Sequence, residues 1–354
     1  INQGILYLFM AVVGGAGNVL GAVVGATIIT LLQQYLQDVL PLLLGTAGNF
    51  EVVVFGVLVI VLLQRARDGV WPWIGRLLPH ATAPPVHASA AILPQRARSP
   101  AAGALLEVRQ LRKAFGGLVA VNDLSFTLQA SEIVALIGPN GAGKSTTFAL
   151  LSGALAMDSG DVLLDGQSIA GCTPYAIARR GIGRTFQHVK LVGTMSVVDN
   201  VALGAYLRGH SGVVRAALRL DRREEAQVRA EALRQIERCG LAMHAYVQAQ
   251  NLALGQQRIV EIARALAADP ALLLLDEPAA GLRYAEKQAL ATLLRDLRSE
   301  GMTILLVEHD MQFVMDLADR VIVMDFGEKL AEGQPAQIQH DPAVVEAYLG
   351  AAAA

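Results

Sequence analysis

Gly138-Pro139-Asn140-Gly141-Ala142-Gly143-Lys144-Ser145-Thr146 stands between a short apolar run and a helical pattern. These residues fit the phosphate-binding pattern G-x-x-x-x-G-K-[ST], whose glycines let successive backbone amides point at one phosphate. The run at residues 133–137 predicts a buried parallel strand, and the residues after Lys144 predict a helix whose N-terminus adds its dipole. Lys144 is then placed to reach the β- and γ-phosphates, and Ser145 to ligate Mg²⁺. The alternative, a glycine-rich turn, does not account for the complete motif in this context.

Two further strand patterns end in polar residues. Residues 271–275 run into Asp276 and Glu277, and residues 303–307 are followed closely by His309. Ligands of open α/β sheets bind at the carboxyl ends of the strands, so these side chains are expected near the phosphate-binding loop. Asp276 suits the Mg²⁺ shell through water, Glu277 suits orienting or deprotonating the attacking water, and His309 is placed to reach the γ-phosphate. Without the loop, structural roles would be preferred for these residues.

The composition predicts more than one kind of domain. The 354 residues are 53% hydrophobic and only 17% charged, which is too apolar for an ordinary soluble enzyme and indicates membrane-embedded sequence. The formal net charge of −2 gives no general affinity for nucleic acid. Cys172 and Cys239 lie far apart without metal-ligand spacing, so free thiols in a reducing compartment are expected. The chain starts at Ile1 without a charged leader, which favours a fragment shortened at its N-terminus over a signal peptide.

The first residues of the chain, 1–64, contain neither Lys nor Arg. The nearly uninterrupted apolar stretch Ile5–Leu32 is long enough to span a bilayer, which takes about 20 helical residues. Gly17, Gly21 and Gly25 make a smooth face on which another helix can approach, although no partner for it is evident inside the chain. The alternatives are a break into two pieces at the glycine cluster and a buried hairpin of soluble helices.

A second apolar run, residues 52–63, needs flanking residues to span, because a dozen helical residues rise only about 18 Å. Basic residues and tryptophans follow it, namely Arg65, Arg67, Arg76, Trp71 and Trp73. Such residues mark the cytoplasmic interface, so the loop at residues 33–51, which has acids and no base, is expected to face outward. The predicted topology is in–out–in, with everything after Arg65 in the cytoplasm.

The rest of the chain divides into a linker and one domain. Residues 80–104 are rich in Pro and Ala without periodicity and predict an extended linker. Alternating patterns at residues 106–109 and 124–128 predict an antiparallel β portion before the phosphate-binding loop. Residues 176–249 are mostly helical in pattern, and their charged stretch 221–238 is expected to be a solvated helix face because acids balance its arginines. The predicted domains are residues 1–79, 80–104 and 105–354.

The order of these motifs resembles the ATPase subunits of ABC transporters over about residues 105 to 350. The resemblance implies an α/β P-loop ATPase with an antiparallel β portion, a parallel-sheet core and a helical subdomain, preceded here by an all-α transmembrane fragment. It also implies that Phe115 stacks on adenine and that Gln187 senses Mg²⁺ and touches the permease. Leu252–Gln256 matches the signature that caps ATP bound to the opposite subunit, and His309 matches the switch histidine on the γ-phosphate.

Together, the motifs and the resemblance give a set of expected site residues. For catalysis these are Glu277, His309 and Gln187, and for Mg²⁺ they are Ser145, Gln187 and Asp276. The residues expected to bind ATP are Phe115, Gly138, Asn140, Gly141, Gly143, Lys144, Ser145, Thr146, Leu252, Gly255 and Gln256. Two departures from the family pattern bear on the rate of hydrolysis: the usual Ser and Gly of the signature are Ala253 and Leu254, and Arg283 stands where an acid is usual.

One branch of the family is closer than the others. The resemblance to the ATP-binding subunit of branched-chain amino-acid importers rests on residues 115–121, 184–187, 256–258, 277–282, 308–311 and 347–350. Val12–Asn18 and the arginine-terminated helix after it resemble the C-terminal end of that system's permease, so a permease–ATPase fusion is expected. The implied partners are a second ATPase domain in a homo- or heterodimer, permease subunits and an extracytoplasmic solute-binding protein, at a bacterial-type inner membrane with the ATPase domain in the cytoplasm.

Other functions remain open at this point. An ABC importer of urea or short amides is one alternative. A non-transport ABC ATPase is another, but it would carry tandem ATPase domains or a coiled-coil insertion and no membrane segment. An exporter half-molecule would have six helices before the ATPase domain and Ser in the signature. Intact Lys144, Asp276, Glu277 and His309 argue against a membrane anchor with an inactive nucleotide fold.

Overall fold

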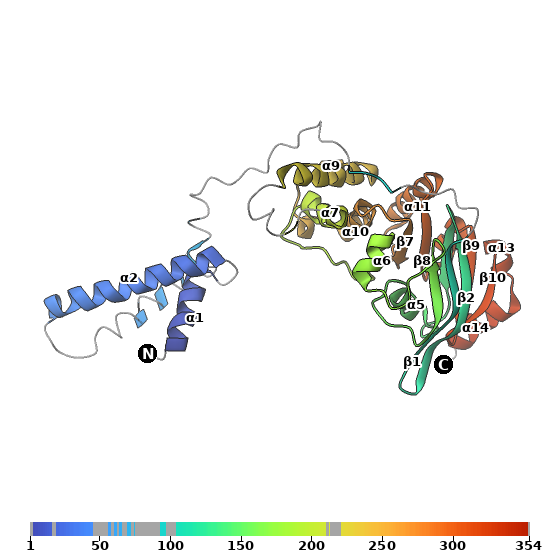
Figure 1. Cartoon of the computed structure of the whole chain (residues 1–354), viewed down its shortest axis with the longest axis horizontal. Coiled ribbons are helices and arrows are strands. Elements are labelled where there is room, and N and C mark those ends of the chain that lie inside the picture. Colours follow the sequence, from blue (N-terminus) through green and yellow to red (C-terminus); the bar gives the residue numbers. More distant parts are fainter. Residues whose placement is uncertain are drawn as a thin grey trace. The chain divides into compact units, whose positions relative to one another are not determined.

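The computed structural model of the chain describes residues 3–15, 19–44, scattered positions between 56 and 74, and residues 93–96, 104–209, 212 and 221–352. The chain divides into two compact units, Ile1–Pro85 and Val86–Ala354 (Figure 1). The domain boundaries at residues 79 and 104 stay predictions, because most of the linker lies outside the described residues.

The first unit contains two helices, α1 (Gln3–Gly14) and α2 (Val19–Leu44). The stretch expected to form one span is therefore divided at the glycine cluster, as the alternative interpretation had it. The loop predicted over residues 33–51 is wrong for its first part, because α2 continues through Asp38 and Pro41 to Leu44.

Glycines let α1 and α2 approach closely. A Cβ atom added at Gly25 would lie 2.0 Å from the Met10 carbonyl oxygen, and one at Gly21 would lie 2.7 Å from that of Gly14. The prediction that this glycine face has no partner inside the chain is thus wrong for Gly21 and Gly25, because α1 is their partner. The helices share a small apolar core built on Val13, Ile29 and Leu36. Gly17 and Asn18 lie outside the described residues.

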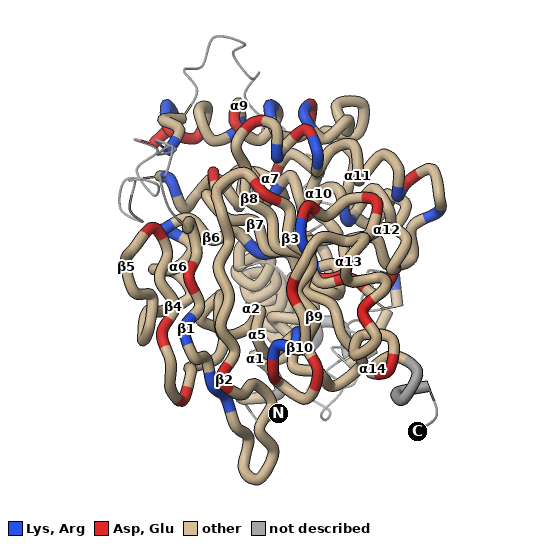
Figure 2. The backbone as a smooth tube through the Cα atoms, turned by 90° about the vertical axis from the view of Figure 1, so that its right-hand side faces the viewer, with Lys and Arg blue, Asp and Glu red and all other residues tan. Residues whose placement is uncertain are grey.

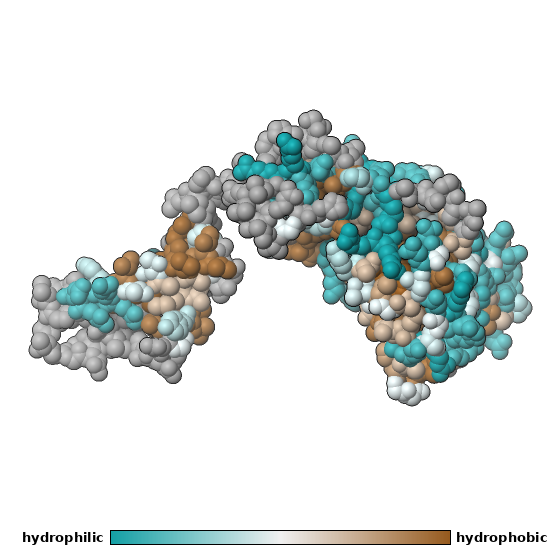
Figure 3. All heavy atoms as spheres, in the orientation of Figure 1, coloured by the Kyte–Doolittle hydropathy of each residue, from teal (hydrophilic) through white to brown (hydrophobic). Residues whose placement is uncertain are grey.

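One helix among the described residues, over Val19–Asp38, is long and apolar enough to cross a membrane. Length and composition alone do not distinguish such a helix from a buried core helix or a signal sequence. Apolar side chains lie at the surface of this unit in Figure 3, among them Leu20, Val23 and Leu31. Most of the second apolar run and most of the arginines and tryptophans after it lie outside the described residues, so the topology stays a prediction.

The second unit is built on a six-stranded sheet in the order β10-β9-β3-β8-β7-β6. The five strands from β9 to β6 are parallel, and β10 pairs antiparallel with β9 at the edge. The strands are β3 (Ile133–Ile137), β6 (Ile182–Arg184), β7 (Leu272–Asp276), β8 (Thr303–Val307), β9 (Arg320–Asp325) and β10 (Glu328–Gly333). The predicted strands at residues 133–137, 271–275 and 303–307 are confirmed to within one residue.

This sheet has an apolar core on each face, because all residues of β3, β7 and β8 are buried. Alternate side chains of a strand point to opposite faces, so Val134 and Leu136 enter one core while Ile133, Ala135 and Ile137 enter the other. Helices cover the second face, including α11 (Tyr284–Ser299), α12 (Met311–Leu317), α13 (Pro335–Ile338) and α14 (Pro342–Ala352).

The first core is closed by a four-stranded antiparallel sheet in the order β2-β1-β4-β5. Helix α5 (Lys144–Leu151) lies between the two sheets and buries Phe148, Leu150 and Leu151 there. The strands of this sheet are β1 (Ala104–Phe115), β2 (Leu118–Gln129), β4 (Ser159–Leu164) and β5 (Gln167–Ser168). The predicted antiparallel β portion is confirmed, and β4 and β5 extend it.

A helical layer forms a third core from α7 (Val197–Ala205), α9 (Arg222–Arg238) and α10 (Leu254–Ala267). Local signals begin its elements: Ser196 caps α7 by accepting from the Asp199 amide. The short α6 (Pro174–Arg180) starts at a Thr173 cap and ends at Gly181, whose φ of 115° suits glycine. Strand β6 follows directly, so the pattern read as mostly helical from residue 176 contains one sheet strand.

Helix α9 carries both signs of charge along its surface (Figure 2). The prediction that its acids lie on a solvated face is wrong for Glu231, whose side chain is fully buried. Arg234 and Arg208 pair with this carboxylate at 2.7 and 3.2 Å, and Gln235 donates to it at 2.8 Å. These partners lower the pKa of Glu231 against the opposing effect of burial, and they satisfy the buried charge.

The two cysteines are free thiols, as predicted. Cys172 packs against the core between the sheets, and Cys239 packs against the other two cores. Burial raises the pKa of Cys239 to about 12, so its thiol stays protonated and unreactive at neutral pH. Among the described residues no group of three or more His, Cys, Asp or Glu side chains is arranged to hold a metal ion by itself.

The contact between α7 and α10 generates a stability prediction. A Cβ atom at Gly204 would lie 1.9 Å from the Arg264 carbonyl oxygen. Gly204→Ala should therefore force the helices apart and lower the unfolding free energy by about 1–3 kcal/mol, despite a helix-propensity gain of about 1 kcal/mol. Denaturant unfolding measures the change. Gly117→Ala is the control, because that glycine has open space around it and an ordinary φ. Equal stability of the two variants would contradict the packing argument.

Candidate active site

The phosphate-binding loop leaves β3 and is pressed between two backbones. A Cβ atom at Gly138 would lie 2.1 Å from the Met324 carbonyl oxygen, and one at Gly143 would lie 2.2 Å from that of Ala120. Their φ values of 152° and 98° also lie where side chains are disfavoured. Helix α5 starts directly after the loop without a side-chain cap. The first amides of that helix therefore face outward, as an anion site requires.

Lys144 begins α5 and folds back over the loop. Its ammonium group donates to the carbonyl oxygens of Gly138 at 2.7 Å and Pro139 at 2.8 Å, and the residue is only 6% exposed. Burial lowers its pKa, while the charge of Glu277 acts in the opposite direction. A cation already removed from water is attracted strongly by a phosphate that enters the loop. Asn140, Gly141 and Ser145 are exposed beside it.

Strand β7 delivers Asp276 to the site at its last position. The residue is 5% exposed; one carboxylate oxygen, Oδ2, accepts from Arg184 at 3.4 Å, whereas Oδ1 is buried without a hydrogen-bond partner in the described part of the chain. Burial raises the pKa of Asp276, and Arg184 opposes the shift. A buried carboxylate oxygen without a donor fits a divalent cation or its water shell.

Glu277 lies at the centre of the expected catalytic residues. Its Oε1 atom accepts a hydrogen bond from the Gln187 amide at 3.0 Å and lies 2.9 Å from Nε2 of His309. The backbone holds it in place, because its N–H donates to the Val307 carbonyl at 2.9 Å and its carbonyl accepts from Arg258 at 2.8 Å. Its φ of 49° is unusual for a residue other than glycine. Three segments far apart in the sequence therefore meet at one carboxylate.

Sequence reasoning missed two polar residues that support this arrangement. Glu308 is 3% exposed, and its side chain accepts from the amides of Ala279 at 2.6 Å and His309 at 3.2 Å. Burial raises the pKa of Glu308. Through these two hydrogen bonds, Glu308 joins the segment after β7 to the segment after β8. The second residue is Arg184, whose guanidinium donates to the Asp276 carboxylate at 3.4 Å. An acid directly at a strand end, next to a candidate histidine, was the available signal for Glu308.

Phe115 lies at the tip of the β1–β2 hairpin, where it pairs with Leu118. The side chain is exposed, and the Lys113 ammonium lies 5.6 Å from its ring centre. The strand beyond the tip reaches the phosphate-binding loop, since Ala120 abuts Gly143. Phe115 is thus free to stack on a planar group near the loop.

The signature residues do not join the other candidates within the chain. The Gln256 side chain accepts from the Ala253 amide at 3.2 Å and contacts His244 at 3.0 Å, so it is used inside the helical layer. Gly255 is buried, with Glu286 beside it, and Leu254 is 51% exposed. Within residues 104–209 and 221–352, no hydrogen bond joins residues 252–256 to residues 138–146. The structure thus brings the loop and the catalytic candidates together but leaves the signature apart.

Comparisons with known proteins agree with this geometry. The sequence profile of the ABC transporter family matches residues 121–280, and that of the branched-chain amino acid ATP-binding cassette transporters matches residues 328–354. The high-affinity branched-chain amino acid transport ATP-binding protein LivG of Escherichia coli K12 is 45% identical over 251 residues, which are 70% of this chain and 98% of LivG.

Solved structures show the same fold. The ADP conformation of MJ1267, an ATP-binding cassette of an ABC transporter, superimposes with a TM-score of 0.62 at 29% identity and covers 70% of this chain and 99% of that one. The dimeric structure of MJ0796, a bacterial ABC transporter cassette, gives a TM-score of 0.56 at 25% identity, with 65% and 98% of the two chains covered.

The fold and the site define the class of protein: a P-loop ATPase that binds ATP and couples its hydrolysis to transport. The chain belongs to the ABC transporter family, as an ATP-binding component of the branched-chain amino acid importer group. The expected P-loop ABC ATPase fold is confirmed. The individual roles of the site residues stay predictions.

The position of Lys144 generates a test of nucleotide binding. Lys144→Ala removes the buried ammonium from the loop and should weaken ATP binding by about tenfold or more, because a charge-assisted contact contributes about 1.5–3 kcal/mol. Titration with a fluorescent ATP analogue measures the affinity. Lys329→Ala, which removes an equal charge from the surface strand β10, is the control. Unchanged ATP affinity in Lys144→Ala would remove Lys144 from the site.

Proposed function

We propose that this chain hydrolyses ATP in a dimer of ATPase domains to drive the import of branched-chain amino acids through a permease. The observation that carries the hydrolytic part is the meeting of Gln187 and His309 at Oε1 of Glu277, next to the unpaired oxygen of Asp276. The solute class rests on the family group and on the names of relatives such as LivG.

The phosphate-binding loop and the hairpin hold the nucleotide. The loop amides and Lys144 bind the β- and γ-phosphates, with Asn140, Gly141, Ser145 and Thr146 lining the loop, and Phe115 stacks on the adenine ring. Lys144 then exchanges its two loop carbonyls for phosphate oxygens, which are stronger acceptors because they carry charge.

A divalent cation fits the polar groups beside the loop. The exposed Ser145 hydroxyl would hold Mg²⁺ together with Gln187 and, through water, Asp276. When bound, Mg²⁺ neutralises charge on the phosphates. The buried Asp276, whose pKa burial raises, is stabilised as a carboxylate by such a cation.

Glu277 acts as the general base for hydrolysis. A water that approaches the γ-phosphorus gives its proton to the Glu277 carboxylate as the new P–O bond forms and the bond to the β–γ bridging oxygen breaks. His309 contacts Glu277 and acts on the γ-phosphate of bound ATP. By its resemblance to the family, Gln187 reports the occupied site to the permease; its segment follows β6, the last strand in the order of the sheet.

The separation of the signature from the loop supports a dimer. Leu252, Gly255 and Gln256 lie in the helical layer, with no bond to their own loop among the described residues, so they serve ATP held by a second domain. MJ0796 is itself a dimeric cassette. Ala253 supplies no hydroxyl to the γ-phosphate, and Arg283 supplies no acid at the contact between the two sites. Hydrolysis therefore relies on the backbone of Gly255 and on the N-terminus of α10.

The first unit belongs to a permease fused to the ATPase domain. Helix α2 has the length and apolar surface of a membrane span, and glycine packing holds α1 against it. The protein then lies in a bacterial-type inner membrane, with residues 1–79 in the permease part, residues 80–104 as linker and residues 105–354 in the cytoplasm. Permease subunits and an extracytoplasmic solute-binding protein complete the importer. The family group does not favour import of urea or a non-transport role.

The assignment of the general base is tested by Glu277→Gln, which keeps the size of the side chain but accepts no proton. We expect the hydrolysis rate to fall by about 10²- to 10⁴-fold while ATP binding persists. Phosphate release and ATP titration measure the two properties, and size-exclusion chromatography with ATP should show an accumulated dimer. Glu346→Gln on the exposed face of α14 is the control. Turnover at the wild-type rate in Glu277→Gln would assign the role of base to another group.

The solute class is tested by reconstitution in proteoliposomes. With permease subunits, a solute-binding protein and ATP, labelled leucine should accumulate, and unlabelled valine and isoleucine should compete whereas urea should not. The Lys144→Ala chain is the matched control without ATP-driven uptake. The chain alone should transport nothing. Leucine that is neither transported nor competing would rule out this solute class.

A further inference from the structure

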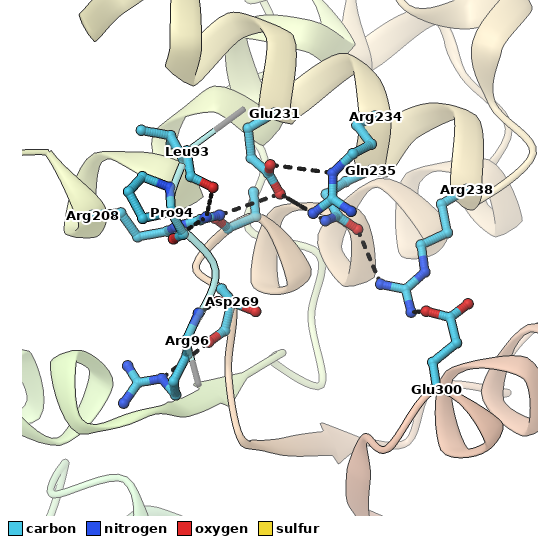
Figure 4. A network of polar contacts seen from close by, with 11 residues as sticks. Leu93, Pro94, Arg96, Arg208, Glu231, Arg234, Gln235, Arg238, Asp269 and Glu300 are labelled. Carbon is cyan, nitrogen blue, oxygen red and sulfur yellow. Dashed lines mark hydrogen bonds and ion pairs between the residues drawn. The ribbon is translucent and has the colours of Figure 1, made fainter. Parts of the chain in front are cut away.

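A short extended segment, Leu93-Pro94-Gln95-Arg96, belongs to the second unit and lies outside the residues that the family profiles match, and it contacts elements far along the chain (Figure 4). We call it the linker clasp. It belongs to the part of the sequence predicted to be an extended linker, and it forms neither helix nor strand. None of its contacts with these elements is part of the ATPase site.

The first contact is apolar. Leu93 is only 4% exposed and joins the core of the helical layer, together with residues of α7, α9 and α10 such as Val201, Val228 and Val260. Burial of this leucine removes its apolar side chain from water, which favours docking of the segment at this place. Pro94 follows it, and its fixed φ and missing amide suit an extended segment that is held by side chains.

The second contact is a pair of hydrogen bonds from one arginine, Arg208. The Arg208 guanidinium donates to the carbonyl oxygens of Leu93 at 3.0 Å and Pro94 at 2.8 Å. Its other terminal nitrogen donates to the Ala267 carbonyl at 3.1 Å and pairs with the buried Glu231 at 3.2 Å. Because Glu231 and Ala267 belong to α9 and α10, Arg208 holds the clasp to both helices (Figure 4).

The third contact lies at the corner between α6 and β6. The Arg96 guanidinium donates to the last carbonyls of α6, those of Arg180 at 2.7 Å and Arg179 at 2.8 Å. A cation suits this end of a helix, where unpaired carbonyls carry negative partial charge. The Arg96 amide also donates to the Asp269 carboxylate, just before β7. Gly181 permits the approach, since a Cβ there would lie 3.0 Å from the guanidinium carbon.

We propose that the linker clasp is a docking motif, and that the surface formed by Arg208, Asp269 and the end of α6 is its binding site on the same chain. The clasp crosses from the helical layer to the corner at which β6 begins. It thereby fixes the point at which the preceding linker leaves the ATPase unit and restrains the helical layer relative to the sheet. Strand β6 leads to Arg184 and Gln187, so this restraint lies on the element that enters the active site. The inference does not depend on the transported solute.

The test is limited proteolysis of the full chain with trypsin. Docking engages the Arg96 side chain, so the bond after Arg96 should be cut at least about tenfold more slowly in the native chain than in a synthetic peptide of residues 86–103. Leu93→Asp places a charge in the apolar pocket and should bring the rate close to that of the peptide. Val86→Asp, which adds the same charge upstream in the linker, should leave the wild-type rate.

Mass spectrometry of the fragments measures each rate, and hydrogen exchange of the Arg96 amide gives a second readout that should move in parallel. Because Leu93 packs in the core of the helical layer, thermal unfolding and ATP binding are measured to confirm that the Leu93→Asp chain is folded. Rapid cleavage after Arg96 in the wild type would overturn the proposal. So would a Leu93→Asp chain that is cut and exchanges as slowly as the wild type.

Discussion

The rest of the site depends on one constraint: the phosphate-binding loop lies directly against the backbones of two strands that are distant from each other in the sequence. Gly138 abuts Met324 on β9 of the six-stranded sheet, and Gly143 abuts Ala120 on β2 of the antiparallel sheet. The loop therefore takes its shape only when both sheets have packed on α5. A side chain at either glycine would separate the sheets at the point where the phosphates are to bind. The shape of the nucleotide site therefore depends on the packing of the core between the two sheets.

The same packing removes charged groups from water around the loop. Burial lowers the pKa of Lys144 and raises those of Asp276 and Glu308, although counter-charges and amide donors oppose part of each shift. Burying a charged group costs free energy of folding, so these shifted pKa values mark residues that are not placed for stability alone. The three residues lie at or after the carboxyl ends of β3, β7 and β8. A site prepared in this way gains most when a charged ligand with its cation completes it. In the helical layer, by contrast, the buried Glu231 is paired within the chain by Arg208, Arg234 and Gln235.

The errors of sequence reasoning have identifiable physical origins. In α9 the buried residues Val228, Glu231, Ala232, Gln235 and Ile236 follow helical spacing, so one acid lies on the buried stripe. A balance of charges over the whole helix could not reveal this. In the first unit, the glycine spacing correctly indicated close helix approach, but the partner, α1, was hidden inside what read as one continuous apolar stretch.

The sequence by itself determined the strands that are buried on both faces, the loop between β3 and α5, and the acids at the strand ends. These features are local: a run of apolar residues, a glycine pattern and a neighbouring polar residue suffice to specify them. Tertiary structure alone decided that Gln187 and His309 share one oxygen of Glu277, that Gln256 turns back onto its own helix, and that Leu93 enters the helical core. Each of these contacts joins segments far apart in the chain or selects one rotamer among several. The periodicity of apolar residues predicts which face of a helix or strand is buried, but it does not predict which distant atoms that face contacts.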